Sequence, residues 1–379
     1  MKYALMHQHI QVAILDLDDA RITNIDSIQA PDHFPLGVMS MKGRPDVREL
    51  DSWLNDRSIP DTRDGLNRLS QKPNILDSYA LSLSDHYWLR PEGLPLSWDA
   101  INFFHNDFST ELGDLLFGRM SADIHQMSPD ATTDGWLKKR WLKGKQVKAL
   151  GFQTELQLSP NSRYLLKAGS GIQQEPFNEV IASAIMERLK MPHVHYSLAF
   201  LDSQPYSVCE NFLTDRTELV TAWMVLNSRP MQPEDTTFSH LLKTCQDLGM
   251  PDMRVDIEKM LTLDYIIANG DRHYNNFGFV RNAKTLKWLG FAPIFDSGTS
   301  LWHNKENLGQ DSDSKAFELS QREQLDLVSD LSWYPTDLEN LETQIKEIFR
   351  SPYIQEARSD AIAKAVLKRA KYARKKNFL

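Results

Sequence analysis

One stretch of the chain, residues 264–300, limits the possible folds more than any other. An apolar pattern with helical spacing leads into this stretch and predicts a helix; its members are Ile257, Leu261, Tyr265 and Ala268. The pattern stops at Asn269 and Gly270, a pair that is typical of turns. The residues that follow are therefore expected to form a loop at the end of a buried helix.

Three polar residues stand at defined places after this helix. Asp271 lies on the expected loop, and Asn276 follows five residues later. Two apolar segments, 277–280 and 286–295, are separated by a polar turn and predict a β-hairpin, directly after which comes Asp296. The order is thus a helix, a loop with a carboxylate and an amide, a hairpin, and a second carboxylate.

This order matches the needs of phosphoryl transfer. A transferase of the protein-kinase type uses one carboxylate to accept the proton of the attacking hydroxyl, and an amide oxygen with a second carboxylate to hold Mg²⁺. In kinases the first two have the spacing D-x-x-x-x-N, and the second carboxylate is the Asp of D-F-G. Asp271 and Asn276 have that spacing, and Asp296 opens an Asp-x-Gly sequence. The alternative is that Asp271 and Asn276 are ordinary turn residues and that Asp296 caps a helix.

The chain upstream predicts a small β-rich lobe with one amphipathic helix. Short strands are expected at 136–141, 152–158, 163–166, 194–201 and 205–212, and a helix at 177–189. Kinases pair a strand lysine, which binds the α- and β-phosphates, with a glutamate of the following helix. Lys167 ends one expected strand and Glu179 lies twelve residues later on the helix, although Lys167 taken alone also suits a solvated strand end. Glu175 is the other possible partner, but it precedes Pro176 and is expected where the helix begins.

Two further places in this lobe suit a nucleotide. The segment around Gly135, with Lys138 as a point charge, can contact phosphate, but it lacks both glycine-rich phosphate motifs. Glu210 and Phe212 lie at the end of the expected strand 205–212, where a kinase hinge offers backbone groups to adenine. Both places are therefore candidates for nucleotide binding.

Five segments together resemble the HipA-like serine/threonine kinases of bacteria and phages, whose best-known members are toxins of toxin–antitoxin modules. The segments are TTDGWLKKRW, YLLKAG, QQEPFNEVIASAIMERL, NGDRHYNNFGF and APIFDSG, which together cover roughly residues 130–300. The resemblance implies ATP and Mg²⁺ as cofactors and a protein hydroxyl as acceptor. It implies that Asp271 is the catalytic base, that Asn276 and Asp296 are the Mg²⁺ ligands, that Lys167 holds the phosphates, and that the segment around Gly135 is the phosphate loop.

The same resemblance bears on regulation and partners. Family members can phosphorylate a hydroxyl of their own phosphate loop, and Thr132 and Thr133 are the candidates here. A separately encoded antitoxin is an expected partner. No helix-turn-helix segment is recognisable, so direct DNA binding is not expected. Residues 1–125 match the best-known toxins poorly.

The expected fold class is α+β, with a protein-kinase-like two-lobe fold preceded by an extra N-terminal domain. The expected domains are 1–125, of unknown role, 126–215 as the nucleotide-binding lobe, and 216–379 as the helical lobe, with the main boundary near the polar segment 121–134. The aromatic residues between 81 and 108 indicate a packed core or an interdomain face.

Composition restricts where such a chain works. A formal net charge of −8 argues against broad nonspecific binding to nucleic acid. Only Cys209 and Cys245 are present, which favours a reducing compartment over a disulfide framework. Neither a signal peptide nor an apolar run of bilayer length is visible, so we expect a cytoplasmic protein without a membrane partner.

Two other functions compete with an active kinase. One is a catalytically weak pseudokinase that serves as a protein-interaction scaffold. The other is a metal-dependent hydrolase built on Asp271, His273 and the pair His193 and His195, since a His-x-His on a strand points both imidazoles to one face. In the kinase interpretation, His273 and Asp264 are expected to brace the catalytic loop through hydrogen bonds.

Overall fold

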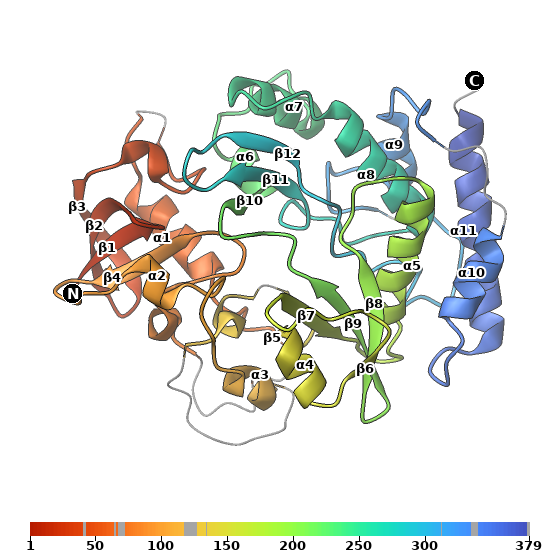
Figure 1. Ribbon diagram of the computed structural model, residues 1–379. Helices are drawn as coiled ribbons and strands as arrows, with labels where there is room; N and C mark the ends of the chain where they lie inside the picture. The colour runs from red at the N-terminus through yellow and green to blue at the C-terminus, as the bar shows by residue number, and fades with distance from the viewer. Residues whose placement is uncertain are drawn as a thin grey trace.

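The computed structural model of this protein describes residues 1–40, 43–63, 66, 73–116, 127–133, 135–311, 313–334 and 340–376. Half of the segment 121–134, near which the domain boundary is expected, falls outside these residues, so the three domain limits stay predictions. The described strands form three antiparallel sheets (Figure 1).

The first sheet belongs to the N-terminal residues and lies at one end of the molecule in Figure 1. Its order is β3-β2-β1-β4, with the strands β1 (Lys2–His7), β2 (Ile10–Asp18), β3 (Arg21–Ile28) and β4 (Tyr87–Pro91). Asp19 and Ala20 join β2 to β3 with φ angles of 44° and 62°, as a two-residue turn of type I′ requires. Helix α1 (Val47–Asp56) packs beside β3 and buries Leu50, Trp53 and Leu54.

Short helices lie between β3 and β4 and between the first sheet and the second. They are η1 (Pro31–His33), η3 (Ile75–Ser78), α2 (Trp98–Ile101), α3 (Glu111–Leu116) and η4 (Pro129–Thr132). The aromatic residues between 81 and 108 form a buried cluster that includes Trp88, Trp98 and Phe103 and also reaches Leu213. The expected packed aromatic core is therefore present, and it joins the N-terminal residues to the rest of the chain.

The second sheet carries the residues expected to bind nucleotide. Its order is β5-β7-β9-β8-β6, with the strands β5 (Lys139–Lys143), β6 (Gln153–Thr154), β7 (Arg163–Ala168), β8 (Tyr196–Leu201) and β9 (Gln204–Glu210). Helix α4 (Gly144–Ala149) follows β5, and the longer α5 (Glu175–Arg188) packs against β8 and β9. The expected strands are present, although β5 begins three residues later than expected and β6 is much shorter than 152–158.

The third sheet has the order β10-β11-β12, with the strands β10 (Thr217–Thr221), β11 (Gly278–Asn282) and β12 (Trp288–Phe291). Strands β11 and β12 form the expected hairpin. The sequence patterns do not predict β10, which pairs along its whole length with β11 and so depends on a partner far away in the chain.

The remaining described regular elements are helices. They are α6 (Ala222–Leu226), α7 (Thr237–Asp247), α8 (Arg254–Ile267), α9 (Gln321–Asp326), α10 (Leu341–Ile348) and α11 (Glu356–Lys376). Helix α8 is the predicted buried helix, and α9 and α11 pack on it. Its C-cap is Ala268, which has a left-handed φ of 51°. The helix therefore ends just before the expected turn at Asn269 and Gly270. Within the part of the chain that the structure describes, no helix has the length and apolar character that crossing a bilayer requires.

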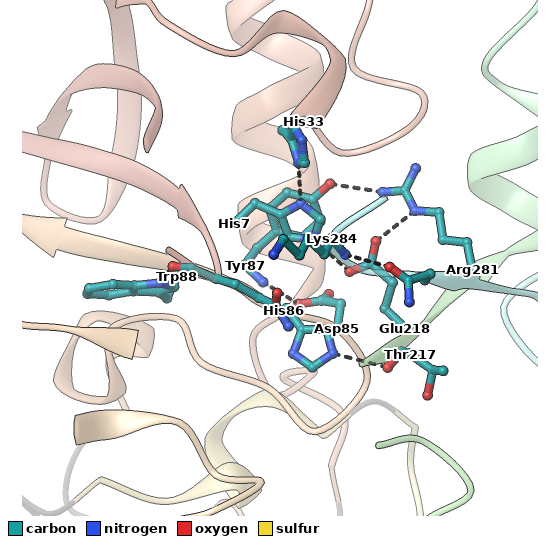
Figure 2. A network of polar contacts seen from close by, with 12 residues as sticks. His7, His33, Asp85, His86, Tyr87, Trp88, Thr217, Glu218, Arg281 and Lys284 are labelled. Carbon is teal, nitrogen blue, oxygen red and sulfur yellow. Dashed lines mark hydrogen bonds and ion pairs between the residues drawn. The ribbon is translucent and has the colours of Figure 1, made fainter. Parts of the chain in front are cut away.

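A buried polar network fastens the first sheet to the third (Figure 2). Glu218 of β10 lies 2.9 Å from the Nε2 of His7 in β1, and it accepts a hydrogen bond of 2.6 Å from the Nε of Arg281 in β11. Arg281 also donates to the hydroxyl of Tyr87 in β4 at 3.0 Å. Burial raises the pKa of the Glu218 carboxyl, but His7 and Arg281 outweigh burial and hold that pKa well below its usual range. The buried charges of Glu218 and Arg281 thus pair within the third sheet, and their further hydrogen bonds to His7 and Tyr87 join that sheet to the first.

Candidate functional site

Lys167 is the centre of the candidate site. It lies on β7 and is almost completely buried, and its ammonium is 2.8 Å from Glu179 Oε1 and 2.8 Å from Asp296 Oδ1. Glu179 comes from α5, and its other oxygen accepts a 2.9 Å hydrogen bond from the backbone N–H of Ser297. The expected partner Glu179 is therefore present, and one lysine joins the strand, the helix and the segment after the hairpin.

Glu175 has a different role from Glu179. It is the first residue of α5, as its position before Pro176 suggested, and its carboxylate accepts hydrogen bonds from the backbone N–H and the hydroxyl of Ser170. A carboxylate at the start of a helix is favoured by the helix dipole and by the free N–H groups there. Glu175 thus stabilises the turn before α5 and does not pair with Lys167.

The electrostatics of this cluster favour the ionised forms of Lys167 and Asp296, whereas burial raises the pKa of the Glu179 carboxyl. Burial lowers the pKa of the Lys167 ammonium, but the carboxylates of Asp296 and Glu179 outweigh burial and hold that pKa well above its usual value. Burial also raises the pKa of the Asp296 carboxyl, yet Lys167 and Lys139 outweigh it and leave that pKa well below its usual range. Lys167 is therefore positively charged and Asp296 negatively charged at neutral pH.

Arg272 holds the loop that carries Asp271 and Asn276. Its guanidinium is completely buried and donates to both carboxylate oxygens of Asp264 in α8, at 2.9 and 3.0 Å. It also donates to the backbone oxygens of Asn276 at 2.8 Å and of Phe295 at 2.6 Å. One side chain thus connects the end of α8, the loop and the segment that leads to Asp296.

Hydrogen bonds of Asp264 and His273 brace this loop, as expected, and Arg272 adds further ones. Asp264 braces the loop as expected, through Arg272 and a 2.9 Å bond from the Asn269 amide. The His273 ring accepts a bond of 3.3 Å from the N–H of Asn275, and its backbone N–H donates to the Asp271 backbone oxygen at 2.8 Å. Its backbone oxygen accepts a bond of 2.8 Å from the N–H of Asn276, and the side chain lines the adjacent cleft. Arg272 adds the connections to α8 and to the segment before Asp296, because a guanidinium offers five donors and an imidazole at most two.

Asp271 and Asn276 lie together on this loop. The Asn276 amide donates to the backbone oxygen of Asp271 at 3.1 Å, which leaves its amide oxygen directed elsewhere. The carboxylate of Asp271 forms an ion pair with the ammonium of Lys315. Asp296 has a φ of 55°, a left-handed conformation that aspartate adopts more readily than most residues. The loop and the Asp296 turn thus present a carboxylate, an amide and a second carboxylate to one cleft.

The segment around Gly135 is held by the N-terminal part of the chain. The Nε of Arg63 donates to the backbone oxygen of Gly135 at 2.6 Å, and the rest of the guanidinium contacts Thr133. Gly135 has a φ of 95°, which favours glycine, and a Cβ there would lie 2.7 Å from the Nζ of Lys139. The residues that line the cleft include Gly135 and Lys139 but not Lys138. In this segment, Lys139 therefore lines the cleft in place of the expected Lys138.

Lys139 and Lys167 are direct partners across the β5–β7 pair. Two like charges opposite each other in a sheet are unfavourable unless negative charge lies beside them. Asp296 supplies some of that charge, because both lysines act to lower its pKa. This pair of lysines is a suitable place for the phosphates of a nucleotide.

A single cleft of about 710 Å³ brings these residues together. Its volume lies within the range of small-molecule sites. Its lining comes from the second and third sheets, from α1 and from the loops between these elements. It includes Trp53, Arg57, Asp85, Gly135, Lys139, Lys167, Tyr196, Glu210, Phe212, Asp271, Asn276 and Asp296. Phe212 stacks on Phe295 with ring centroids 5.8 Å apart, so the expected hinge forms an apolar wall near the end of β9. Helix α1, through Trp53, forms another part of the cleft wall.

The donor groups in this cleft fit a nucleotide with a hard divalent cation. Asn276 and Asp296 offer an amide oxygen and a carboxylate, which are oxygen ligands of the kind Mg²⁺ prefers. Lys139 and Lys167 offer positive charge for phosphates, and the edge near Glu210 and Phe212 is apolar enough for a base. The cleft therefore suits ATP and Mg²⁺ better than it suits a transition metal, which would favour nitrogen or sulfur ligands.

His193 and His195 do not belong to this cleft. The lining contains Val194 and Tyr196 but neither histidine, because side chains of an extended segment alternate between its two faces. Both imidazoles lie instead near Glu187 of α5. The structure thus separates the histidine pair from Asp271 and His273, and it does not support the metal-dependent hydrolase.

Comparisons with known sequences point to one family. A family model described as HipA-like C-terminal domain matches residues 141–373. The serine/threonine-protein kinase CtkA of Helicobacter pylori is 26% identical over 147 residues, which are 35% of this chain. That match spans 42% of the length of CtkA.

Comparisons with solved structures show the fold. A chain of the Shewanella oneidensis toxin–antitoxin complex of HipA, HipB and operator DNA matches with a TM-score of 0.58 at 13% identity, over 100% of this chain and 99% of that chain. The crystal structure of the Helicobacter pylori proinflammatory kinase CtkA matches with a TM-score of 0.44 at 17% identity, over 58% of this chain and 92% of that chain. The first match shows the expected α+β, protein-kinase-like fold with an extra N-terminal domain, and it includes residues 1–125, which carry none of the sequence motifs.

Proposed function

The chain belongs to the family of proteins with a HipA-like C-terminal domain, and from this premise we propose that it is an ATP- and Mg²⁺-dependent serine/threonine protein kinase. The observation that carries the proposal is the position of Lys167, which contacts Glu179 and Asp296 in the cleft that Asp271 and Asn276 also line. A kinase needs these groups in this relation, and a scaffold without catalysis has no physical need for all of them.

In the proposed reaction, Asp271 accepts the proton of a serine or threonine hydroxyl while the hydroxyl oxygen attacks the γ-phosphorus of ATP. A new O–P bond forms, the bond between the γ-phosphorus and the bridging oxygen breaks, and ADP leaves. Lys167, whose position Glu179 fixes, holds the α- and β-phosphates. When bound, Mg²⁺ supplies positive charge to the phosphate oxygens, with Asn276 and Asp296 as its protein ligands.

The proposal extends to the chain's own phosphate loop. The hydroxyl of Thr132 donates to the backbone oxygens of Leu81 and Pro129, at 3.0 and 3.2 Å. Thr133 is buried, and its hydroxyl donates to the backbone oxygen of Asp130 at 2.9 Å. Both threonines line the cleft, and autophosphorylation of either would replace these hydrogen bonds of its hydroxyl.

The proposal also covers partner and location. The Shewanella oneidensis match is a complex of HipA with HipB, so we propose a separately encoded antitoxin as a partner of this chain. A protein substrate with an accessible serine or threonine is the proposed acceptor. The cytoplasm, where ATP is abundant, is the proposed location.

The test is incubation of the purified protein with ATP labelled in the γ-phosphate and with Mg²⁺, followed by mass spectrometry. The wild type is expected to transfer label to itself or to an added protein, whereas Asp271→Asn and Asp296→Ala fold but transfer none. Binding of ATP without any transfer, to itself or to proteins of a cell extract, would favour the pseudokinase scaffold. If the wild type neither binds ATP nor transfers label, the kinase proposal is wrong.

A further inference from the structure

A second group of ligand-type side chains lies on the opposite side of β8 from the cleft. Glu187, His193 and His195 each place one nitrogen or oxygen atom within 4.8 Å of the others. Glu187 is in the last turn of α5, and the two histidines flank Val194 just before β8. Among the described residues this is the one cluster of three histidine, cysteine or acidic side chains with such spacing.

The hydrogen bonds of His193 leave one ring nitrogen unused. Its Nδ1 lies 2.8 Å from the backbone oxygen of Met191, and because a carbonyl oxygen only accepts, Nδ1 carries the hydrogen. Its Nε2 is buried and has no hydrogen-bond partner, yet it lies 3.9 Å from Glu187 Oε1. When the ring is neutral, a lone pair of His193 Nε2 therefore faces a lone pair of Glu187 Oε1. The gap between these atoms is too long for a hydrogen bond and suits a cation that binds both.

His195 completes the cluster from the solvent side. Its Nδ1 lies 2.9 Å from the same oxygen of Glu187, and its Nε2 lies 3.3 Å from the hydroxyl of Ser197. If Nε2 carries the hydrogen and donates it to Ser197, Nδ1 is free to bind a metal ion. Metal-binding histidines usually have such a second partner on the other ring nitrogen. Here Met191 and Ser197 provide those partners for His193 and His195.

We propose that Glu187, His193 and His195 form a binding site for Zn²⁺ or a similar transition-metal ion. Two imidazoles and one carboxylate are ligands that Zn²⁺ accepts, whereas Mg²⁺ prefers oxygen ligands alone. His195 and Glu187 are 58% and 51% exposed, which leaves room for water as the fourth ligand. This site is independent of the proposed Mg²⁺ site and of the kinase proposal.

The position of the site gives the ion a structural role. His193 forms a parallel bridge with Ile294, and the N–H of Val194 donates to the Ile294 oxygen at 2.9 Å. Ile294 stands two residues before Asp296, and α5 carries Glu179. A bound ion thus ties the C-terminal end of α5 to the segment that leads to Asp296, and it stabilises the folded chain because the unfolded chain does not hold these ligands together.

The test is a titration of the chelator-treated full chain with Zn²⁺ against a chromophoric chelator, with thermal unfolding measured alongside. The wild type is expected to bind one Zn²⁺ per chain and to melt at a higher temperature with Zn²⁺, with no such effect of Mg²⁺. Glu187→Gln and His195→Ala are expected to lose at least about tenfold in affinity, since even partners of metal ligands contribute that much. His105→Ala is the matched control, because His105 is 55% exposed and pairs with a single carboxylate, that of Asp215.

The outcomes are distinct. Absence of saturable binding by the wild type overturns the proposal. Equal affinity of the wild type, Glu187→Gln and His195→Ala also overturns it, because the ion then binds elsewhere on the chain. Loss of Zn²⁺ binding in these two variants, with nucleotide binding retained, supports it and separates this site from the nucleotide cleft.

Discussion

The ammonium of Lys315 forms an ion pair with the carboxylate of Asp271, although Lys315 lies beyond the hairpin and the Asp296 turn. Its neighbours Ala316 and Phe317 are buried, and the N–H of Phe317 donates to the hydroxyl of Tyr274 at 2.8 Å. The backbone that carries Lys315 is thus anchored beside the catalytic loop. In the proposed kinase reaction, the ammonium would orient Asp271 and face the phosphoryl group that is transferred.

Replacing Lys315 is therefore expected to slow transfer more than it weakens nucleotide binding. We expect Lys315→Met to lower kcat about tenfold or more with little change in the KM for ATP, because the charge acts mainly where negative charge develops. Steady-state kinetics of the variant measures both constants. Lys364→Met, which removes an exposed lysine of α11, is the control and should match the wild type. An unchanged or higher kcat in Lys315→Met contradicts this role.

The Lys167–Glu179 pair predicts a strong coupling between two substitutions. Lys167→Met leaves the buried carboxylate of Glu179 without its cation, so we expect a loss of about 3–5 kcal/mol in the free energy of unfolding. Lys167→Met combined with Glu179→Gln is expected to recover much of that loss, because the unpaired charge is gone. Denaturant unfolding of the two single variants and the double variant measures the coupling. If the losses of the two single variants simply add in the double variant, the pair does not stabilise the fold. Both variants that lack Lys167 should also lose ATP binding.

The network around Glu218 predicts an acid-sensitive contact between the first and third sheets. The pKa of the Glu218 carboxyl lies below its usual value, so its contribution to stability is present above about pH 4.5 and is lost as the pH falls toward the folded-state pKa. We expect Glu218→Gln to lose about 3–5 kcal/mol at pH 7 and a smaller amount below pH 4. Denaturant unfolding over this pH range, with Glu306→Gln as an exposed control, measures the difference. A difference that is independent of pH contradicts the assignment.

Asp130 predicts the opposite dependence on pH. Burial raises the pKa of its carboxyl to about 6, and Arg140 acts against that shift. The pKa of this carboxyl is near 4 in the unfolded state and about 6 in the folded state. As the pH rises from about 4 to about 6, the unfolded state loses its proton first, so the free energy of unfolding falls by about 3 kcal/mol. Asp130→Asn keeps an oxygen for the Trp141 N–H and should remove this fall. Relative to the wild type, Asp130→Asn should therefore become more stable between pH 4 and pH 7, as denaturant unfolding can measure. Asp18→Asn, which changes an exposed carboxylate, is the control and should not.

Arg63 predicts a role for the N-terminal residues in nucleotide binding. Its guanidinium holds the backbone oxygens of Gly135 and Thr133 at the edge of the cleft. We expect Arg63→Lys to raise the KM for ATP several-fold with a small change in kcat, because an ammonium cannot donate in several fixed directions as a guanidinium does. Kinetics with Arg48→Lys, an exposed arginine of α1, as the control tests this. An equal KM in both variants would show that the contact does not position the loop.

Local spacing explains what could be predicted of the fold. The helix that ends at Ala268, the turn after it and the hairpin β11–β12 all depend on residues close together in the chain, and these elements are present. The same holds for the Lys167–Glu179 pair, whose members are twelve residues apart on adjacent elements. Strand β10 was missed because its strand partner, β11, lies far along the chain.

The sequence by itself determined the order of the groups that make the candidate site. The spacing of Asp271, Asn276 and Asp296 and the strand–helix pattern around Lys167 follow from local periodicity, which a single sequence displays. Only the tertiary structure decided which distant side chains join them. Lys315 beside Asp271, Arg63 beside Gly135 and the histidines beside Glu187 come from separate elements. Such contacts depend on how the sheets and helices pack, and no spacing along the chain records that packing.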